Sequence, residues 1–214
     1  MTRPDIFSDP VCPWCYVGKA NLDRALGQHP DHPFQIQWHP FQLNPDMPPE
    51  GEDVDEHLAR KYGGTPEQFA RNRDAIRERG AAVGFAFKPE GRGRIVNTFD
   101  AHRLLYWAGL QGAAAQLALK QALLQAYHGR GERVDHVDVL LGAVRAAGLD
   151  EAAARAVLAG DDHAADVRAA EAEWQRAGIR AVPAVVINDR HLISGGQPPE
   201  VFEQALRQIA QSAD

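Results

Sequence analysis

The 214-residue sequence predicts an α/β fold in which two short strand-containing segments flank a long helical insertion. Three observations support this prediction. Strand-like apolar patterns occur only near the two ends of the chain, helical patterns separated by glycines fill the middle, and a Cys-x-x-Cys motif lies where the first strand gives way to the first helix. The elements therefore follow the order βαβ, helical insertion, ββα.

The first segment reads as strand, helix and strand. Residues 5–8 are apolar-leaning and lie between prolines, which predicts a short strand. The helix predicted over residues 14–26 has apolar or small residues near helical spacing, with Pro13 in its first turn and Gly27 at its end. Residues 34–43 alternate apolar and polar side chains at their start, which predicts the second strand.

The middle of the chain is almost entirely helical in pattern. Thr65 and Gln68 form a predicted capping box ahead of one helix, and Asn97 or Thr98 is placed to cap another. Glycines separate the helical stretches without a fixed repeat period. The further predicted helices span residues 113–127, 137–147, 151–158 and 164–177.

Strand character returns near the end of the chain. Residues 182–187 are β-branched and apolar, and Asn188-Asp189 predicts a tight turn into a short strand at residues 191–193. Pro199 then opens the last predicted helix. These signals complete the ββα part of the fold.

We divide the chain into a unit made of residues 1–50 plus 179–214 and an inserted all-helical domain made of residues 51–178. Hydrophobic residues make up 44% of the chain and charged residues 24%, which is ordinary globular composition. A chain of this length can form a stable hydrophobic core without disulfide bonds. The fold therefore does not need a structural disulfide.

Composition also bounds the partners and the compartment. The formal net charge is −6, and charges of both signs are interspersed, so the sequence shows no basic patch of the kind that binds nucleic acid. No apolar run reaches the length of a membrane span, and the first residues lack the basic and apolar regions of a secretory signal. We therefore expect a cytoplasmic protein with no nucleic-acid or membrane partner. In that reducing compartment a Cys-x-x-Cys motif is more often catalytic or metal-binding than structural.

The motif itself contains Cys12 and Cys15, the only cysteines of the chain, separated by Pro13 and Trp14. Unpaired N–H groups and the dipole at a helix N-terminus stabilise a thiolate and lower a cysteine pKa from its ordinary value of ~8.5. We therefore predict that Cys12 is an exposed nucleophile and that Cys15 is the buried resolving thiol of a disulfide-exchange site. Because neither Pro13 nor Trp14 is charged, the helix terminus should be the main source of this stabilisation.

Half of a zinc site is the alternative interpretation of the motif. Such a site needs four protein ligands, and the chain has no second Cys-x-x-Cys motif, so two histidines would have to complete it. The nearest histidines in sequence are His29, His32 and His39. We favour redox chemistry with no bound metal.

Five further side chains are interpreted as packing or surface residues, and two of them have a catalytic role as an alternative. His39 and His102 could accept a proton during exchange, but we favour roles in packing or at the surface. Trp107, Tyr127 and Trp174 fall at helical spacing and are predicted to lie in the core between helices.

Four segments, in order along nearly the whole chain, carry a family resemblance. They are DIFSDPVCPWCYVGK (residues 5–19), WHPFQLNP (38–45), NTFDAHR (97–103) and ISGGQPP (193–199). These segments resemble the DsbA family, and specifically its FrnE-like branch. The resemblance implies a thioredoxin fold with an inserted helical domain and an activity as a dithiol–disulfide oxidoreductase.

The resemblance also implies that Val182-Pro183 is the cis-proline pair of thioredoxin-like proteins. A cis bond there turns the backbone of Val182 toward the sulfurs, where an extended substrate pairs with it strand to strand. Pro13, Trp14, Val182 and Pro183 are therefore expected to contact the substrate. The alternative interpretation of Pro183 is a proline that begins an edge strand.

These inferences predict an enzyme that exchanges disulfides of proteins or small molecules, with disulfide isomerisation as a further option and glutathione as an optional redox partner in place of a bound cofactor. The second hypothesis is a glutathione-dependent isomerase of small aromatic or polyketide-like metabolites, similar to 2-hydroxychromene-2-carboxylate isomerases. Those enzymes typically have serine in the position of Cys12. The third hypothesis is a redox-sensitive binding module. Substrate, reduction potential, recycling partner and oligomeric state stay open.

Overall fold

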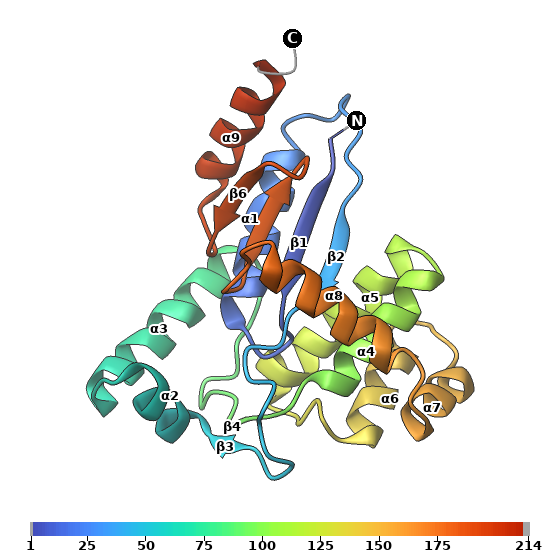
Figure 1. The fold of residues 1–214 in the computed structure, drawn as a ribbon. Helices are drawn as coiled ribbons and strands as arrows, with labels where there is room; N and C mark the ends of the chain where they lie inside the picture. The colour runs from blue at the N-terminus through green and yellow to red at the C-terminus, as the bar shows by residue number, and fades with distance from the viewer. Residues whose placement is uncertain (1, 212–214) are drawn as a thin grey trace.

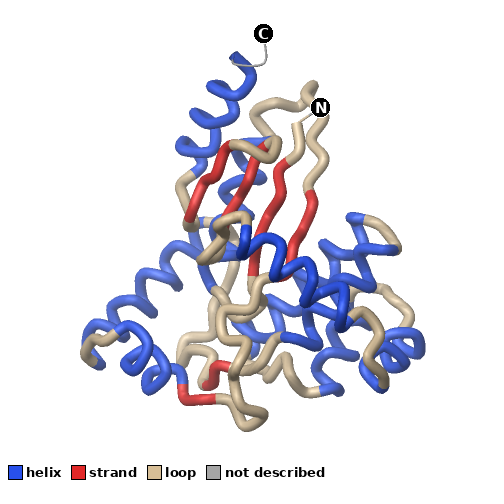
Figure 2. The backbone as a smooth tube through the Cα atoms, viewed as in Figure 1, coloured by secondary structure: helices blue, strands red, loops and turns tan. Residues whose placement is uncertain are grey.

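A mixed sheet of four strands brings the two ends of the chain together (Figure 1, Figure 2). The computed structural model describes residues 2–211. The strand order is β2-β1-β5-β6, made of β1 (Pro4–Ser8), β2 (Gln37–Pro40), β5 (Ala184–Ile187) and β6 (His191–Ser194). β1 pairs in parallel with β2 and antiparallel with β5, and β5 pairs antiparallel with β6.

Two helices, α1 (Pro13–Leu26) and α9 (Pro199–Gln211), pack against each other and cover one face of this sheet. Side chains alternate between the faces along a strand, so Ile6 contributes to this core and Phe7 to the opposite one. The other buried members of this core are Leu22, Ala25, Val185, Ile187, Phe202, Leu206 and Ile209. The predicted order of βαβ and ββα around an insertion is confirmed.

The opposite face of the sheet is covered by α8 (Ala164–Arg176), the last helix of the insertion. The Trp174 ring lies edge-on to Phe7 with the ring centroids 4.7 Å apart, and both rings join a small apolar cluster that includes Phe41 and Val186. The predicted place of Trp174 between helices is therefore wrong. The domain boundary that we predict at residue 178 places α8 in the insertion, but α8 packs on the sheet of the other unit.

The larger part of the insertion is a lobe of helices with its own core, here called the α4–α7 lobe (residues 99–159). Leu104, Leu119 and Leu123 have no exposed surface in this core. Tyr127 is buried in this core and Trp107 packs against the core, as predicted. The lobe consists of α4 (Phe99–Leu110), α5 (Ala113–Leu124), a π-helix (Gln125–Arg130), α6 (Val137–Ala146) and α7 (Glu151–Ala159).

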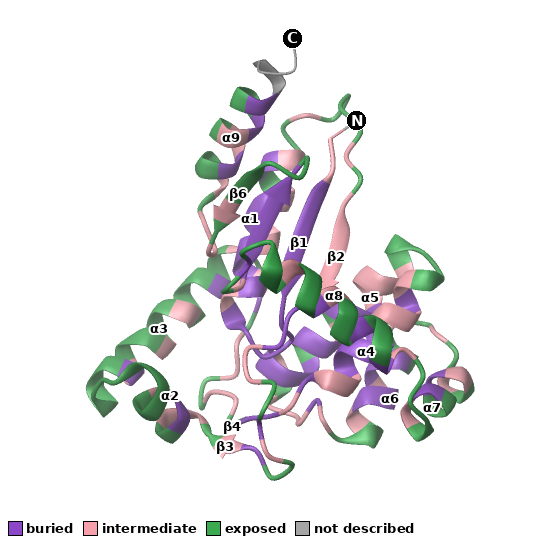
Figure 3. Ribbon diagram, viewed as in Figure 1, coloured by how far each residue is buried: buried purple, intermediate pink, exposed green. Residues whose placement is uncertain are grey.

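The smaller part, here called the α2–α3 arm, consists of α2 (Val54–Tyr62) and α3 (Pro66–Ala82). Only His57, Phe69 and Gly80 are buried on these two helices. Most of the arm is exposed, whereas much of α4 and α5 is buried or half-buried (Figure 3).

A two-stranded ribbon lies at the base of this arm, where β3 (Glu52–Asp53) pairs antiparallel with β4 (Arg94–Ile95). The prediction that residues 51–178 are all helical is wrong at this point. Each strand has two residues, which is too short for an alternating pattern to stand out in the sequence.

Several local predictions are confirmed and two boundaries change. The capping box of Thr65 and Gln68 is present, and Asn188 and Asp189 have φ values of 53° and 57°, as a type I′-like turn requires. The second strand is shorter than predicted and begins at Gln37, and the helix predicted to run through Tyr127 changes to a π-helix after Leu124. Among the described residues, no helix combines the length and apolarity needed to cross a membrane.

Candidate active site

Cys12 is the N-cap residue of α1, so its sulfur stands where a serine or aspartate oxygen usually caps a helix. Pro13 follows at the first helical position, where it has no N–H to donate. The first main-chain N–H groups of the helix are therefore those of Trp14 and Cys15. The backbone of Cys12 is fixed because its own N–H donates to the Asp9 carbonyl at 3.0 Å. A sulfur held in this place is stabilised in its thiolate form.

Both cysteines are free thiols, and the protein shifts their pKa values in opposite directions. A hydrogen bond from the Cys15 thiol does most to lower the pKa of Cys12, and the main-chain N–H of Cys15 and the charge of Arg92 also lower it, against burial and nearby Asp9. Burial and the neighbouring Cys12 raise the pKa of Cys15 well above its ordinary value. The partner thiol therefore acts together with the helix terminus that the sequence predicts as the main source of stabilisation.

The predicted exposure of Cys12 is also wrong. Only 5% of Cys12 is exposed, and Cys15 is buried at 2%. The Cys12 Sγ lies 3.6 Å from the carbonyl oxygen of Val182 and donates to it. The carbonyl of Val182 therefore lies against the Cys12 sulfur.

The Val182-Pro183 peptide bond is cis, as predicted from the family resemblance. Glycines allow α1 to touch this loop directly. A Cβ atom added to Gly18 would lie 3.1 Å from the Cα of Gly196 and 3.3 Å from the Cγ of Pro183. A larger residue at Gly18 would therefore push the loop away from α1.

The residues predicted to contact the substrate surround Cys12. Val182 faces its sulfur, and Trp14 is half-buried beside Gly196, whose added Cβ would lie 3.5 Å from the Trp14 ring. Pro13 is buried and lines a cavity on another side of the site. Their contacts with a substrate stay a prediction.

Asp9, which begins the turn before Cys12, is a buried acid that sequence patterns did not reveal. Its side chain accepts hydrogen bonds from the main-chain N–H groups of Val11 at 3.2 Å and Leu43 at 2.7 Å. Burial raises the pKa of Asp9, while these N–H groups and the charge of Lys120 act to lower it. A carboxylate with a raised pKa is a better proton acceptor than an ordinary aspartate.

Lys120, on α5, is the buried cation of the same cluster. It is 3% exposed, and its Nζ lies 5.6 Å from the ring centroid of Trp38. Burial lowers the pKa of Lys120, whereas the charges of Cys15, Asp9 and Cys12 act to raise it. Lys120 is the sole charged residue between positions 113 and 124, and that pattern could have marked it as buried.

The two histidines considered as proton acceptors have different surroundings. His39 has its Nε2 2.7 Å from Asp5 Oδ1 and its ring stacked on Phe7, so it packs within the sheet. His102 is buried, and its Nε2 lies 3.9 Å from Asp9 Oδ1 without a hydrogen-bond partner. Burial, and secondarily Lys120, lower the pKa of His102 well below its ordinary value, so its ring is neutral.

Two of the three histidines of the zinc alternative are bonded to other groups, whereas the Nε2 of His29 has no hydrogen-bond partner. His32 Nε2 lies 2.7 Å from the Thr2 hydroxyl, and His39 is bonded to Asp5. Within residues 2–211 no three side chains of His, Cys, Asp or Glu are grouped so that they could hold a metal ion. The ligand set of that alternative is not assembled around Cys12 and Cys15.

Comparison with known proteins agrees with this geometry. The sequence model of the DSBA-like thioredoxin domain matches residues 5–207. The crystal structure of a probable DsbA oxidoreductase of Streptomyces coelicolor, SCO1869, has 36% sequence identity and a TM-score of 0.89, covering 97% of this chain and 89% of that chain. The uncharacterized protein YwbO of Bacillus subtilis (strain 168) is 24% identical over 203 residues, which is 94% of each chain.

Two more distant structures share the fold alone. One is the cytosolic disulfide reductase DsbM of Pseudomonas aeruginosa, solved with GSH, at 16% identity and a TM-score of 0.66 over 98% of this chain and 99% of that chain. The other is 2-hydroxychromene-2-carboxylate isomerase, at 14% identity and a TM-score of 0.66 over 99% of this chain and 97% of that chain. The predicted thioredoxin-like fold with a helical insertion is thereby confirmed.

Proposed function

Since this chain belongs to the DSBA-like thioredoxin domain family, we propose that it is a thiol–disulfide oxidoreductase acting through Cys12 and Cys15. One observation carries the proposal. At a single helix start the pKa of Cys12 is lowered and that of Cys15 is raised well above its ordinary value. One sulfur therefore ionises first and attacks, and the other stays protonated until it is needed.

In the first step the Cys12 thiolate attacks one sulfur of a substrate disulfide. A bond forms between the two sulfurs, the substrate S–S bond breaks, and the other half of the substrate leaves as a thiolate. Loss of the Cys12 proton ends the hydrogen bond to the Val182 carbonyl. That carbonyl is then available to an N–H group of an extended substrate, which pairs with it as a strand would.

In the second step Cys15 gives up its proton and attacks the Cys12 sulfur. The second substrate thiolate leaves, a Cys12–Cys15 disulfide forms, and two electrons have passed from the dithiol to the substrate. We assign the proton to the Asp9 carboxylate, with the Lys120 ammonium balancing its charge. Both groups are buried and interact electrostatically with the cysteines.

The substrates, partner and compartment are parts of the same proposal. We propose disulfides of proteins or small molecules as substrates, glutathione as a redox partner, and the cytoplasm as the location. The cytosolic reductase DsbM, solved with GSH, shares the fold and supports these assignments. Membership of the FrnE-like branch and a disulfide-isomerase activity also remain proposals.

Matched cysteine variants test the proposal. With glutathione disulfide, Cys15→Ala should accumulate a mixed disulfide on Cys12, seen by intact-mass spectrometry, and should lose net reduction of insulin while retaining disulfide shuffling. Cys12→Ser should lose both activities by about a thousandfold or more. Equal loss of both activities in Cys15→Ala would contradict the assigned roles.

The same variants separate the alternative functions. A glutathione-dependent isomerase like 2-hydroxychromene-2-carboxylate isomerase predicts glutathione binding and metabolite turnover that survive Cys15→Ala. A redox-sensitive binding module predicts client binding that is unchanged in Cys12→Ser. Either result, without disulfide exchange by the unaltered protein, would overturn the oxidoreductase proposal.

A further inference from the structure

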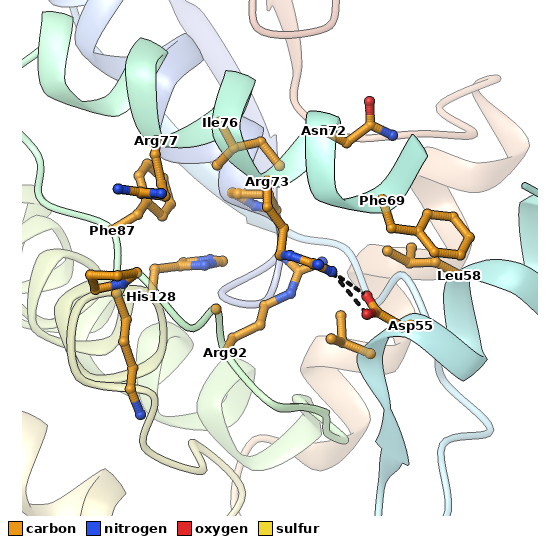
Figure 4. A pocket seen from close by; sticks show the side chains of 15 residues that line it. Asp55, Leu58, Phe69, Asn72, Arg73, Ile76, Arg77, Phe87, Arg92 and His128 are labelled. Atoms are coloured by element: carbon orange, nitrogen blue, oxygen red, sulfur yellow. Dashed lines mark hydrogen bonds and ion pairs between the residues drawn. The ribbon is translucent and has the colours of Figure 1, made fainter. Parts of the chain in front are cut away.

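A cavity opens beside the active-site helix, between the α2–α3 arm and the segment of residues 87–92 (Figure 4). It encloses about 580 Å³ of empty space, part of it open to solvent. Pro13, the residue directly after Cys12, is part of its wall. The cavity therefore reaches the residue that follows Cys12, while Cys12 itself is not part of the wall.

Most of the wall is apolar. Leu58 of α2 and Phe69 and Ile76 of α3 face Phe87 across the space, as the close-up in Figure 4 shows. Phe87 in turn packs edge-on against His128 with ring centroids 5.5 Å apart. The apolar part of the wall favours an aromatic or branched apolar group.

The charges on the wall are unbalanced. Four basic side chains line the cavity, namely Arg73, Arg77, Lys88 and Arg92, against the single carboxylate of Asp55. Arg73 uses one nitrogen to bind both Asp55 oxygens, at 2.7 and 2.9 Å. The chain as a whole carries a formal charge of −6. The cavity is thus a positive region on an acidic protein, and it attracts anions.

Two of the four basic groups still have donors for a ligand. Arg77 reaches only the exposed Asp74, at 3.2 Å, and Arg92 donates through one nitrogen to the Val11 carbonyl at 3.0 Å. A guanidinium has five N–H donors, so both keep donors for a carboxylate. The Val11 contact also places Arg92 next to the residue before Cys12.

His128, on the π-helix, adds an independent sign that this cavity is a ligand site. It lines the cavity, is 3% exposed, and its Nε2 has no hydrogen-bond partner. Burial, and secondarily Arg92, lower its pKa well below the ordinary value, while a hydrogen bond from the ring to the Pro10 carbonyl acts to raise it. The ring is therefore neutral, and its unpartnered Nε2 is an acceptor that suits a donor group of a ligand and not its carboxylate. Buried polar atoms without partners are uncommon in proteins, and π-helices are frequent at functional sites.

We propose that this cavity binds the apolar, anionic substituent of a small disulfide, held so that the sulfur next to that substituent reacts with Cys12. The inference rests on the oxidoreductase function proposed above and specifies its substrate class. The half seated in the cavity becomes joined to Cys12 as its partner half leaves as a thiolate. Attack by Cys15 then releases the seated half as a second thiolate, and the dithiol has lost two electrons.

Two chromogenic disulfides probe this preference in a single turnover of the reduced protein, which needs no added reductant. Dithiobis(nitrobenzoate) is aromatic and carries a carboxylate on each ring, whereas dithiodipyridine is aromatic and uncharged. The measured quantity is the ratio of the two second-order rate constants, carboxylated over uncharged.

The test variant is Arg77→Gln with Lys88→Gln, and its control is Arg71→Gln with Arg79→Gln. Both remove two positive charges, but Arg71 and Arg79 are exposed positions of α3 outside the cavity wall. The ratio should fall by about tenfold in the test variant and stay within about twofold in the control. Salt at about 1 M should shrink the ratio of the unaltered protein, because it screens the attraction.

The outcomes separate the two proposals. If the unaltered protein reacts with neither disulfide through Cys12, the oxidoreductase proposal fails. If it reacts with both but the test and control variants change the ratio equally, or neither changes it, the cavity does not select anions and only the present inference is overturned.

Discussion

The α4–α7 lobe supplies a charge that acts on Cys12 and Cys15, and the α2–α3 arm supplies part of the wall of the cavity beside them, but the two regions are built in opposite ways. The lobe has a closed apolar core, and the groups it turns toward the site, Lys120 and His102, are buried. The arm buries few residues of its own, and the groups it offers, Arg73 and Arg77, are half-buried or exposed (Figure 3).

This difference in burial suggests a different function for each region. A buried ion cluster keeps its geometry and controls protons, because low exposure makes each charge sensitive to its neighbours. A thinly packed, exposed arm belongs to the less stable part of a fold and can adjust to a ligand. We therefore associate the lobe with the thiol chemistry and the arm with recognition of the substrate.

Deletion of apolar side chains should have the largest and most unequal effect. Leu123→Ala removes a side chain with no exposed surface from the lobe core and should lower the free energy of unfolding by about 2–5 kcal/mol. Ile76→Ala on the arm removes a half-buried side chain and should cost less than about 1 kcal/mol. Urea unfolding measures the free energy of unfolding of both variants. An equal loss in the two variants would contradict the difference in packing between the two regions.

A smaller effect is expected from a buried carboxyl group beside the lobe. Glu171 of α8 accepts a hydrogen bond from the main-chain N–H of Gln42 at 2.8 Å, and burial raises its pKa from 4.5 to about 7. Because the folded protein holds this proton more tightly than the unfolded chain, the contribution to stability is complete below about pH 4.5 and is lost as the pH rises through about 7.

Glu171→Gln should remove that pH dependence. Its glutamine keeps an acceptor for Gln42 and carries no charge, so the variant should be more stable than the unaltered protein above pH 7, by on the order of 2–3 kcal/mol, and similar to it near pH 4.5. Glu173→Gln, at an exposed position of the same helix, is the control. If the two variants have the same dependence of stability on pH, burial does not raise the pKa of Glu171.

The sequence predicted the parts of the site that depend on neighbours along the chain. Cys12, Pro13 and Cys15 form a strand-to-helix junction whose signals lie within a few residues of one another. The cis bond before Pro183 came from the family resemblance, because an X-Pro pair alone does not distinguish cis from trans.

The missed features depend on contacts between distant segments. Asp9 and Lys120 are over a hundred residues apart in sequence, and their shared burial arises from the packing of α5 near the active-site turn. Burial of Cys12 likewise follows from the approach of Val182. The separation of the insertion into a lobe and an arm, and hence the cavity, was not visible because helical periodicity reports a helix and not its neighbours.

The most direct test of the central claim is a pH titration of thiolate absorbance in the reduced protein and in Cys15→Ala. We predict that one thiolate appears below the ordinary cysteine pKa, that the second appears only well above it, and that the first pKa rises in Cys15→Ala because the strongest hydrogen bond to Cys12 is gone. Two thiols that titrate together at the ordinary cysteine value would contradict the account.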